Sequence, residues 1–326
     1  MKNQKYYYSM GMSKCVGIIW VYNPSIKEFS KVLESLVQND IERIIIVDNG
    51  SKNRSEIIAL LSNFERRLVS EFIEIGYNSG VHALNVGISR AIEIGAKWVL
   101  LLDDDTVLSP SVVKEALSKY DELCLKNRVI CEKIAVINLH SSRKLSKYIH
   151  RFIPFYIAGQ FSGSLVRLDV VEKNNVRIRE EFFLDQADFD FFNRLRAHGY
   201  YTVYFVKKDA IWHRMGKAMK WVKCPMIKPS GVWIYENPFR FYLIVRNSTV
   251  LLTEERLQPS FYIWQIINYL IILMLIDGVL LTLRTVILGL SHGLFKRLGY
   301  IDPSIIRSKY TPRNKEALKR IMKDKR

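Results

Sequence analysis

The chain has 326 residues and 49% of them are hydrophobic, so a sizeable core can be buried and global disorder is excluded. The formal net charge is +17, which predicts an anionic partner such as nucleic acid, a nucleotide-linked substrate or an anionic membrane. Residues 1–14 lack the apolar core of a signal peptide, and the four cysteines form no CxxC pair. We therefore expect no secretion signal and reduced thiols.

The first third of the chain alternates β-branched apolar runs with amphipathic segments. The run that ends at Leu102 is continuously apolar, which is typical of a parallel strand covered on both faces. A βαβαβ order predicts an open α/β sheet whose ligands bind beyond the carboxyl ends of the strands. Asp48 and Asp103-Asp104-Asp105 each follow such a run, so we expect them to face one crevice. The expected strands are Cys15–Val21, Arg43–Asp48, 72–75 and 98–102, and the expected helices are Ile26–Val37, 55–64 and 79–95.

The middle of the chain is less regular. We expect strands over 131–138, 163–167 and 202–206, and a helix over 188–198. The segment 218–233 contains two prolines and a Ser-Gly pair, which predicts a loop.

The last hundred residues are first apolar and then basic. Residues 261–276 carry no charge, and Asp277 and Arg284 interrupt an apolar stretch that continues to Leu290. A single spanning helix would fit by length, but centrally placed charges are costly in a bilayer. We expect a pair of helices lying in the membrane interface; a span, or a buried core or dimer helix, are the alternatives. From Arg284 to the end, twelve basic and three acidic residues supply +9 of the net charge.

Three adjacent carboxylates, Asp103-Asp104-Asp105, repel one another unless a cation neutralises them. At the end of a buried strand, hard oxygen ligands favour Mg²⁺ or Mn²⁺, and alternate residues such as Asp103 and Asp105 point to one side. Such a metal would neutralise a diphosphate leaving group. The alternative is a solvated acidic turn before the helix-starting Ser109-Pro110.

Two further segments contain candidate site residues. In 182–190, acidic residues alternate with aromatics, and Asp188 begins the expected helix, where a carboxylate can act as a general base. The alternative is that Asp185 or Asp188 caps this helix. His213 follows an apolar strand and is a metal-ligand candidate only if the fold brings it to the aspartates. Together these segments indicate sugar transfer from a nucleotide-diphosphate donor.

The segments that contain these candidate residues, together with further motifs along the chain, resemble those of family 2 glycosyltransferases of the GT-A fold, within the bacterial rhamnosyltransferase-like group. The resemblance spans roughly residues 15–250. Its motifs are 21–24, 46–51, 78–81, 83–88, 101–105, 183–190, 194–196, 199–200, His213 with Gly216, 239–242 and 245–247.

The resemblance implies a metal-dependent, inverting enzyme with a Rossmann-like, mostly parallel central sheet flanked by helices. It implies a metal held by Asp103, Asp105 and His213, and Asp188 as the base that deprotonates an acceptor hydroxyl. The nucleotide sugar would be bound by Tyr22, Asp48, Asn78, Asp103 and Asp104. The acceptor side would be shaped by Asp185, Asp190 and the Ser162-Gly163 turn.

The resemblance implies dTDP-rhamnose as the donor. However, Asp103-Asp104-Asp105-Thr106 stands where the group usually has Asp-Gln-Asp-Ser, and the triple aspartate also resembles galactofuranosyltransferases, which use UDP-galactofuranose. A non-catalytic nucleotide-sugar-binding homologue is a further alternative.

We expect an N-terminal extension over 1–14, a catalytic domain over 15–250 and a membrane-associating appendage over 251–326. A lipid-linked glycan acceptor, in O-antigen, capsule or cell-wall synthesis, would keep the enzyme peripherally at the cytoplasmic face of the bacterial inner membrane. The C-terminal helices offer a homo-oligomer contact. Nucleic acid is excluded as a partner because the positive charge concentrates beside the apolar stretch, away from any aromatic-studded sheet. A processive polymerase is excluded because the chain lacks a Q-x-x-R-W motif.

Overall fold

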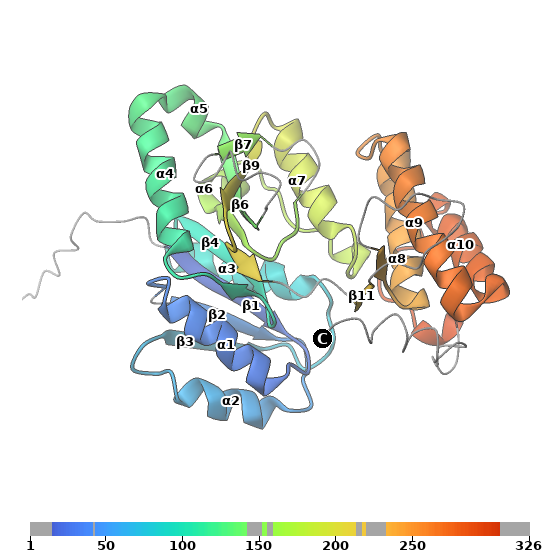
Figure 1. The fold of residues 1–326 in the computed structure, drawn as a ribbon, viewed down its shortest axis with the longest axis horizontal. Helices are drawn as coiled ribbons and strands as arrows, with labels where there is room; N and C mark the ends of the chain where they lie inside the picture. Colours follow the sequence, from blue (N-terminus) through green and yellow to red (C-terminus); the bar gives the residue numbers. More distant parts are fainter. Residues whose placement is uncertain are drawn as a thin grey trace, which may run out of the picture.

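The computed structural model describes residues 15–41, 43–141, 152–154, 159–212, 217–219 and 233–306. His213 and Gly216, the N-terminal extension and most of the basic tail lie outside these ranges. Figure 1 shows an α/β unit and a helical unit side by side, with α7 on the side of the α/β unit that faces the helices.

One mostly parallel sheet organises the α/β unit. β1 pairs in parallel with β2 and β4, β2 with β3, and β6 with β9, whereas β8 runs antiparallel between β4 and β6 and β7 antiparallel beside β9. The predicted fold class is therefore confirmed. In spatial order the described strands are β3 (Val69–Glu74), β2 (Arg43–Asp48), β1 (Cys15–Val21), β4 (Trp98–Asp103), β8 (Ser164–Arg167), β6 (Ile134–Ser141), β9 (Tyr201–Lys207) and β7 (Phe152–Pro154).

Helices cover both faces of this sheet, which explains why its central strands are continuously apolar. In β4, Leu100 and Leu102 are buried on one face, and Val99 and Leu101 on the other. The first face is covered by α1 (Ile26–Val37), α2 (Arg54–Ser62), α4 (Val112–Lys126) and α5 (Arg128–Glu132). The second is covered by α3 (His82–Glu93), α6 (Leu168–Lys173) and α7 (Ala187–Ala197).

The helical unit consists of α8 (Pro238–Thr253), α9 (Pro259–Asp277) and α10 (Val279–Leu294). The expected pair of helices over the apolar stretch is present as α9 and α10, and they are separated at Gly278, whose φ is +90°. α10 packs tightly on α8 because Gly289 and Gly293 have no side chain; a Cβ at Gly293 would come within 2.6 Å of the Arg246 carbonyl oxygen.

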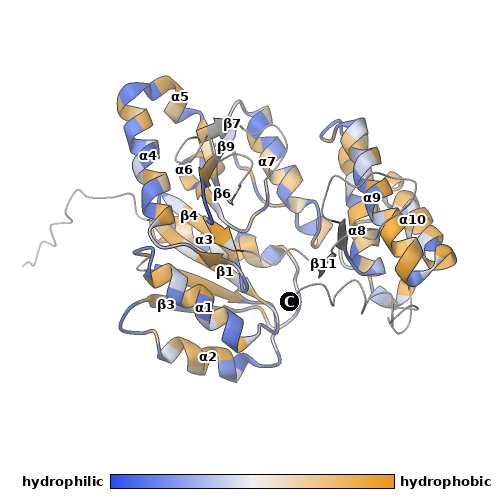
Figure 2. Cartoon of the chain, viewed as in Figure 1, coloured by the Kyte–Doolittle hydropathy of each residue, from blue (hydrophilic) through white to orange (hydrophobic). Residues whose placement is uncertain are grey.

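Large apolar side chains remain exposed on the outside of α9 and α10. Trp264 and Leu280 are 61% and 81% exposed, and Figure 2 shows apolar residues over much of both helices. Within the described part of the chain, α9 is the one helix long and apolar enough to cross a membrane. Asp277, which interrupts the apolar stretch, is buried in the protein and accepts a hydrogen bond from the Tyr235 hydroxyl at 3.1 Å.

Short elements complete the fold and correct three expectations. Cys124 of α4 and Cys131 of α5 form a disulfide, so the expectation of reduced thiols is wrong for this pair. The strand expected over 131–138 begins only at Ile134, because the preceding residues form α5. The two ends of the loop expected over 218–233 belong instead to paired strands, β11 and β12, and residues 220–232 lie outside the described ranges. The remaining elements are β5 (Val107–Leu108), η2 (Glu180–Phe182), β10 (Ile211–Trp212), β11 (Lys217–Met219), β12 (Trp233–Tyr235) and η3 (Pro303–Ile305).

Candidate active site

Tyr22, Asp48 and Asp103, three of the predicted nucleotide-binding residues, lie at the carboxyl ends of three neighbouring parallel strands. Val21 of β1 is paired with Asp48 of β2, and Trp20 with Asp103 of β4. Tyr22 follows β1 directly and its side chain is half exposed. Because parallel strands present their carboxyl ends on one edge, the fold brings Tyr22, Asp48 and Asp103 to the same edge of the sheet.

The loops at this edge are bound to one another by short polar contacts. The buried Asp48 carboxylate accepts the Ser51 backbone N–H at 3.0 Å. The Asn49 side chain accepts the Ser79 hydroxyl at 2.5 Å and donates to the Gly80 carbonyl at 3.2 Å. Asn78, expected to bind the nucleotide, is exposed beside these residues. Asn49 was not singled out by the sequence, yet it joins the loop after β2 to the start of α3.

The Ser162-Gly163 turn supports the triple aspartate from inside the protein. The Asp103 backbone N–H donates to the Ser162 hydroxyl at 2.8 Å, and that hydroxyl also contacts Thr106 at 2.6 Å. Gly163 has a φ of +84° and donates its N–H to the Leu101 carbonyl at 2.8 Å. Both residues of the turn are buried, so they fix the end of β4 and have little surface with which to contact an acceptor.

The charges of the triple aspartate destabilise one another. Burial, followed by the negative charges of Asp103 and Asp105, raises the pKa of Asp104 to about 7, and the Tyr22 backbone N–H opposes this shift. A divalent cation would relieve the same repulsion, so the oxygen donors fit a hard metal ion. Within the described residues, no three His, Cys, Asp or Glu side chains are grouped to hold a metal, and the third expected ligand, His213, lies outside them.

Asp188 lies in the first turn of α7. Burial, together with the smaller effects of the negative charges of Asp185 and Asp103, raises the pKa of this carboxyl to about 7, although the Phe189 N–H, which donates to it at 2.9 Å, opposes the shift. The charge of Asp103 is the smallest of these contributions, so the Asp103 carboxylate lies within electrostatic reach of Asp188. A carboxylate whose pKa lies near neutral pH is suited to accept a proton.

Asp190 has no exposed surface and is surrounded by arginines. Its carboxylate accepts from Arg194 at 2.8 Å and from Arg256 at 2.9 Å, and Arg179 lies 3.6 Å away. These contacts attach α7 to the segment after α8. A wholly buried side chain cannot touch an acceptor, so Asp190 can shape the acceptor side only by holding α7 in place.

Asp185 is paired with a residue of the helical unit. Arg240 of α8 approaches the Asp185 carboxylate through two nitrogens, at 2.5 and 3.3 Å, and also contacts Glu236 at 3.1 Å. Burial raises the pKa of Glu236 to about 7. Sequence reasoning noted the motif that contains Arg240 but could not show that it contacts Asp185, 55 residues earlier.

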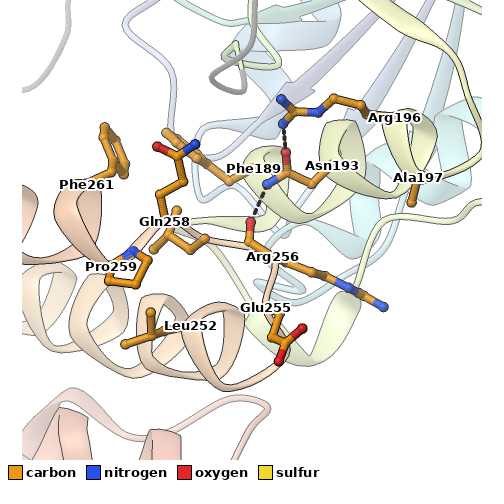
Figure 3. Close-up of a pocket in the computed structure, with 11 residues that line it drawn as sticks. Phe189, Asn193, Arg196, Ala197, Leu252, Glu255, Arg256, Gln258, Pro259 and Phe261 are labelled. Atoms are coloured by element: carbon orange, nitrogen blue, oxygen red, sulfur yellow. Dashed lines mark hydrogen bonds between the residues drawn. The ribbon is translucent and has the colours of Figure 1, made fainter.

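The pocket in Figure 3 is lined by other residues than the aspartates. It has a volume of about 560 Å³ and lies between α7 and the start of α9, where the Asn193 side chain donates to the Arg256 carbonyl at 2.7 Å. Of the predicted site residues that the structure describes, none lines it.

Comparison with known structures supports the fold. The chain superposes on "S. aureus TarS 1-349" with a TM-score of 0.51 at 14% identity, covering 88% of this chain and 82% of that one. The match to the longer "S. aureus TarS" chain spans 41% of its length, with a TM-score of 0.48 and 15% identity. These likenesses concern the fold alone. The mostly parallel sheet and the helical C-terminal region define a fold of the GT-A type.

Comparison with known sequences gives the family. The model of "Glycosyl transferase family 2" matches residues 18–182, so the chain belongs to that family. It is also 24% identical over 282 residues to "dTDP-rhamnosyl transferase RfbF" of Shigella flexneri, covering 79% of this chain and 86% of that protein. The chain is thus a family 2 glycosyltransferase that resembles the rhamnosyltransferases, as its motifs predict.

Proposed function

We propose that this protein is an inverting glycosyltransferase that moves a sugar from a nucleoside-diphosphate donor to an acceptor hydroxyl. The observation that carries the proposal is the position of Asp188 in the first turn of α7, where its half-buried carboxyl has a pKa raised to about 7 and lies within electrostatic reach of Asp103. Asp48 and the neighbouring backbone would hold the nucleotide base, and Asp104 would contact the ribose or the sugar.

The proposed reaction is a single displacement. Asp188 takes the proton of the acceptor hydroxyl, and the oxygen attacks the anomeric carbon from the face opposite the leaving group. A bond forms between the acceptor oxygen and the anomeric carbon while the bond from that carbon to the diphosphate oxygen breaks. The nucleoside diphosphate leaves with the electron pair, and the anomeric configuration is inverted.

Asp103 and Asp105, with His213 as an expected third ligand, would hold Mg²⁺ or Mn²⁺. When bound, the ion would neutralise charge on the diphosphate. The fit rests on the repulsion among Asp103, Asp104 and Asp105, which a cation relieves.

For the donor we propose dTDP-rhamnose, because the relative in Shigella flexneri is named a dTDP-rhamnosyl transferase. UDP-galactofuranose is the second candidate, favoured by the triple aspartate at residues 103–105. The acceptor would be a lipid-linked or polysaccharide glycan of the cell surface.

We further propose that the catalytic domain covers 15–250 and that the C-terminal region binds the cytoplasmic face of the inner membrane peripherally. The exposed apolar side chains of α9 and α10 support this location, and the basic C-terminal sequence suits anionic lipid. A homo-oligomer through these helices is the competing use of the same surface.

A donor panel tests the proposal. Purified protein is incubated with dTDP-rhamnose or UDP-galactofuranose, Mg²⁺ or Mn²⁺ and a polyprenyl-diphosphate-linked acceptor, and glycolipid and released nucleotide are measured. We expect transfer from one donor, abolished by EDTA and restored by metal. Donor binding without turnover under every condition would instead support a non-catalytic nucleotide-sugar-binding homologue.

A further inference from the structure

The loop that precedes the proposed base has an unfavourable backbone conformation. We call residues 183–186, between η2 and α7, the base loop. Two of its non-glycine residues have positive φ angles, Phe183 at +65° and Gln186 at +72°. L-residues adopt this region at an energetic cost, so contacts from the surroundings must hold the loop.

On one side, the start of α3 holds the base loop. The Val81 N–H donates to the Phe183 carbonyl at 2.8 Å. Gly80 permits this close approach, since a Cβ there would lie 1.9 Å from the Phe183 oxygen. These contacts lie within the α/β unit and come from a motif that already indicated the family.

On the other side, α8 of the helical unit holds the base loop and the residue before it. The Asn247 amide donates to the Asp185 carbonyl at 2.6 Å and to the Phe182 carbonyl at 3.0 Å. Arg246 donates to the same Phe182 carbonyl at 3.1 Å. Neither Asn247 nor Arg246 has any exposed surface. Burying two such polar side chains is tolerated only when they are hydrogen-bonded. Both side chains donate N–H groups to backbone carbonyls close to Asp188.

Arg240 of α8 adds an electrostatic contact to the hydrogen bonds that Asn247 and Arg246 make with the base loop and Phe182. Its guanidinium donates hydrogen bonds to the Asp185 carboxylate through two nitrogens. Asp185 is the carboxylate whose charge, after burial, raises the pKa of Asp188. Arg240 therefore stands beside the acidic neighbour of the base, and its positive charge offsets the charge that Asp188 experiences.

We propose that Arg240 and Asn247 of α8 are positioning residues for Asp188. Asn247 fixes the backbone of the base loop so that the carboxylate at the head of α7 points into the crevice. Arg240 holds and neutralises Asp185. The helical unit is thus a working part of the catalytic site, and this inference rests on the proposed role of Asp188.

The charged and titratable groups around Asp188 define the expected pH effect. Asp185 and Asp103 face it, Tyr269 of α9 lies within electrostatic reach, and Glu236 and Arg240 adjoin Asp185. Removing the Arg240 charge leaves Asp185 uncompensated, which favours the protonated form of Asp188. The acid limb of the pH–rate profile should therefore move to higher pH.

The test compares variants in nucleotide release and sugar transfer. Arg240→Met should lower kcat by roughly 10- to 100-fold with the donor KM nearly unchanged, and shift the acid limb upward. Arg240→Lys should recover part of kcat. In the double variant Asp185→Asn with Arg240→Met, the acid limb should return toward the wild-type position. Asn247→Ala should lower kcat without shifting the acid limb as far as Arg240→Met does.

Gly17→Ala provides a structural control. Its new Cβ would lie 3.1 Å from the Ile44 side chain, so it disturbs the packing between β1 and β2 without touching α8 or the base loop. It should lower the Tm and leave kcat and the pH profile of the folded enzyme unchanged. The inference is overturned if Arg240→Met and Asn247→Ala lose activity only in proportion to lost folded protein. A wild-type enzyme that releases no nucleotide from any donor overturns the proposed function itself.

Discussion

The α/β unit and the helical unit differ in where their large apolar side chains lie. In the α/β unit the core is apolar, Asp103 lies at the carboxyl edge of the sheet, and Asp188 in the first turn of α7 lies within electrostatic reach of it. In the helical unit, large apolar side chains such as Trp264 and Leu280 are exposed, whereas Arg246 and Asn247 are completely buried.

This difference fits the two roles proposed for the helical unit. Its exposed apolar face suits a lipid surface, because a large uncovered apolar patch is costly in water. Its buried polar residues contact the loop that presents Asp188. The two proposed roles use different surfaces of the helical unit, so variants on each surface should have separable effects.

The largest effect is expected at the aspartates of the α/β unit. Asp103→Asn and Asp105→Asn should each lower metal-dependent transfer by roughly 10²- to 10³-fold, because a carboxylate that would hold the metal on the diphosphate is lost. Turnover at increasing Mn²⁺ concentration measures this effect.

Asp40→Asn is a control for these variants, because Asp40 is exposed and its positive φ suits asparagine. It should behave as wild type. Wild-type turnover by Asp103→Asn at every metal concentration would contradict a metal role for that residue.

A smaller effect is expected on the outside of the helical unit. Replacing Trp264 and Ile267 with Gln should weaken binding to anionic vesicles about tenfold or more, because two interfacial apolar side chains are lost. Transfer to a water-soluble acceptor should not change. Vesicle co-sedimentation measures the first quantity.

Ile58→Gln is the matched control, since Ile58 is an exposed isoleucine of α2 in the α/β unit. Equal vesicle binding by the wild type and the α9 variant would contradict the membrane role. A concentration-dependent loss of dimer in the α9 variant would favour an oligomer interface instead.

The smallest effect concerns stability. In the folded protein the pKa of Asp188 is raised to about 7, whereas in the unfolded chain it is about 4. The folded state then binds the proton more tightly, so the contribution of Asp188 to the free energy of unfolding falls as pH rises from about 4 to about 7. Asp188→Asn should therefore stabilise the metal-free protein at pH 8, by roughly 1–3 kcal/mol, and hardly at all at pH 4.

Urea unfolding of both proteins in EDTA at the two pH values measures this difference. An equal difference in the free energy of unfolding at pH 4 and pH 8 would show that folding does not raise the pKa of Asp188.

Much of the first half of the fold could be predicted from sequence, because its patterns are local. β1, β2 and α1 have the predicted boundaries, since each combines a clear apolar period with turn residues on both sides. The motifs there also placed Asp48 and Asp103 at strand ends. The helix α4 was not predicted, although Val112, Ala116 and Tyr120 form its buried face at helical spacing.

The remaining parts depend on contacts between distant segments. Arg240 and Asp185 are separated by 55 positions, and the buried environment of Asp190 is made by arginines from three segments. The pairing of Cys124 with Cys131 depends on how α4 turns into α5 at Asn127. No periodicity in the sequence encodes such relations.

The most direct test of the account compares Asp188→Asn with wild type and with the Asp40→Asn control, measuring sugar transfer and donor affinity on the same preparations. The account predicts that transfer by Asp188→Asn falls by roughly 10²- to 10⁴-fold while the donor Kd stays within about threefold of wild type. Transfer close to the wild-type rate, or a loss of donor binding that accounts for the whole defect, would contradict the role of Asp188 as the base.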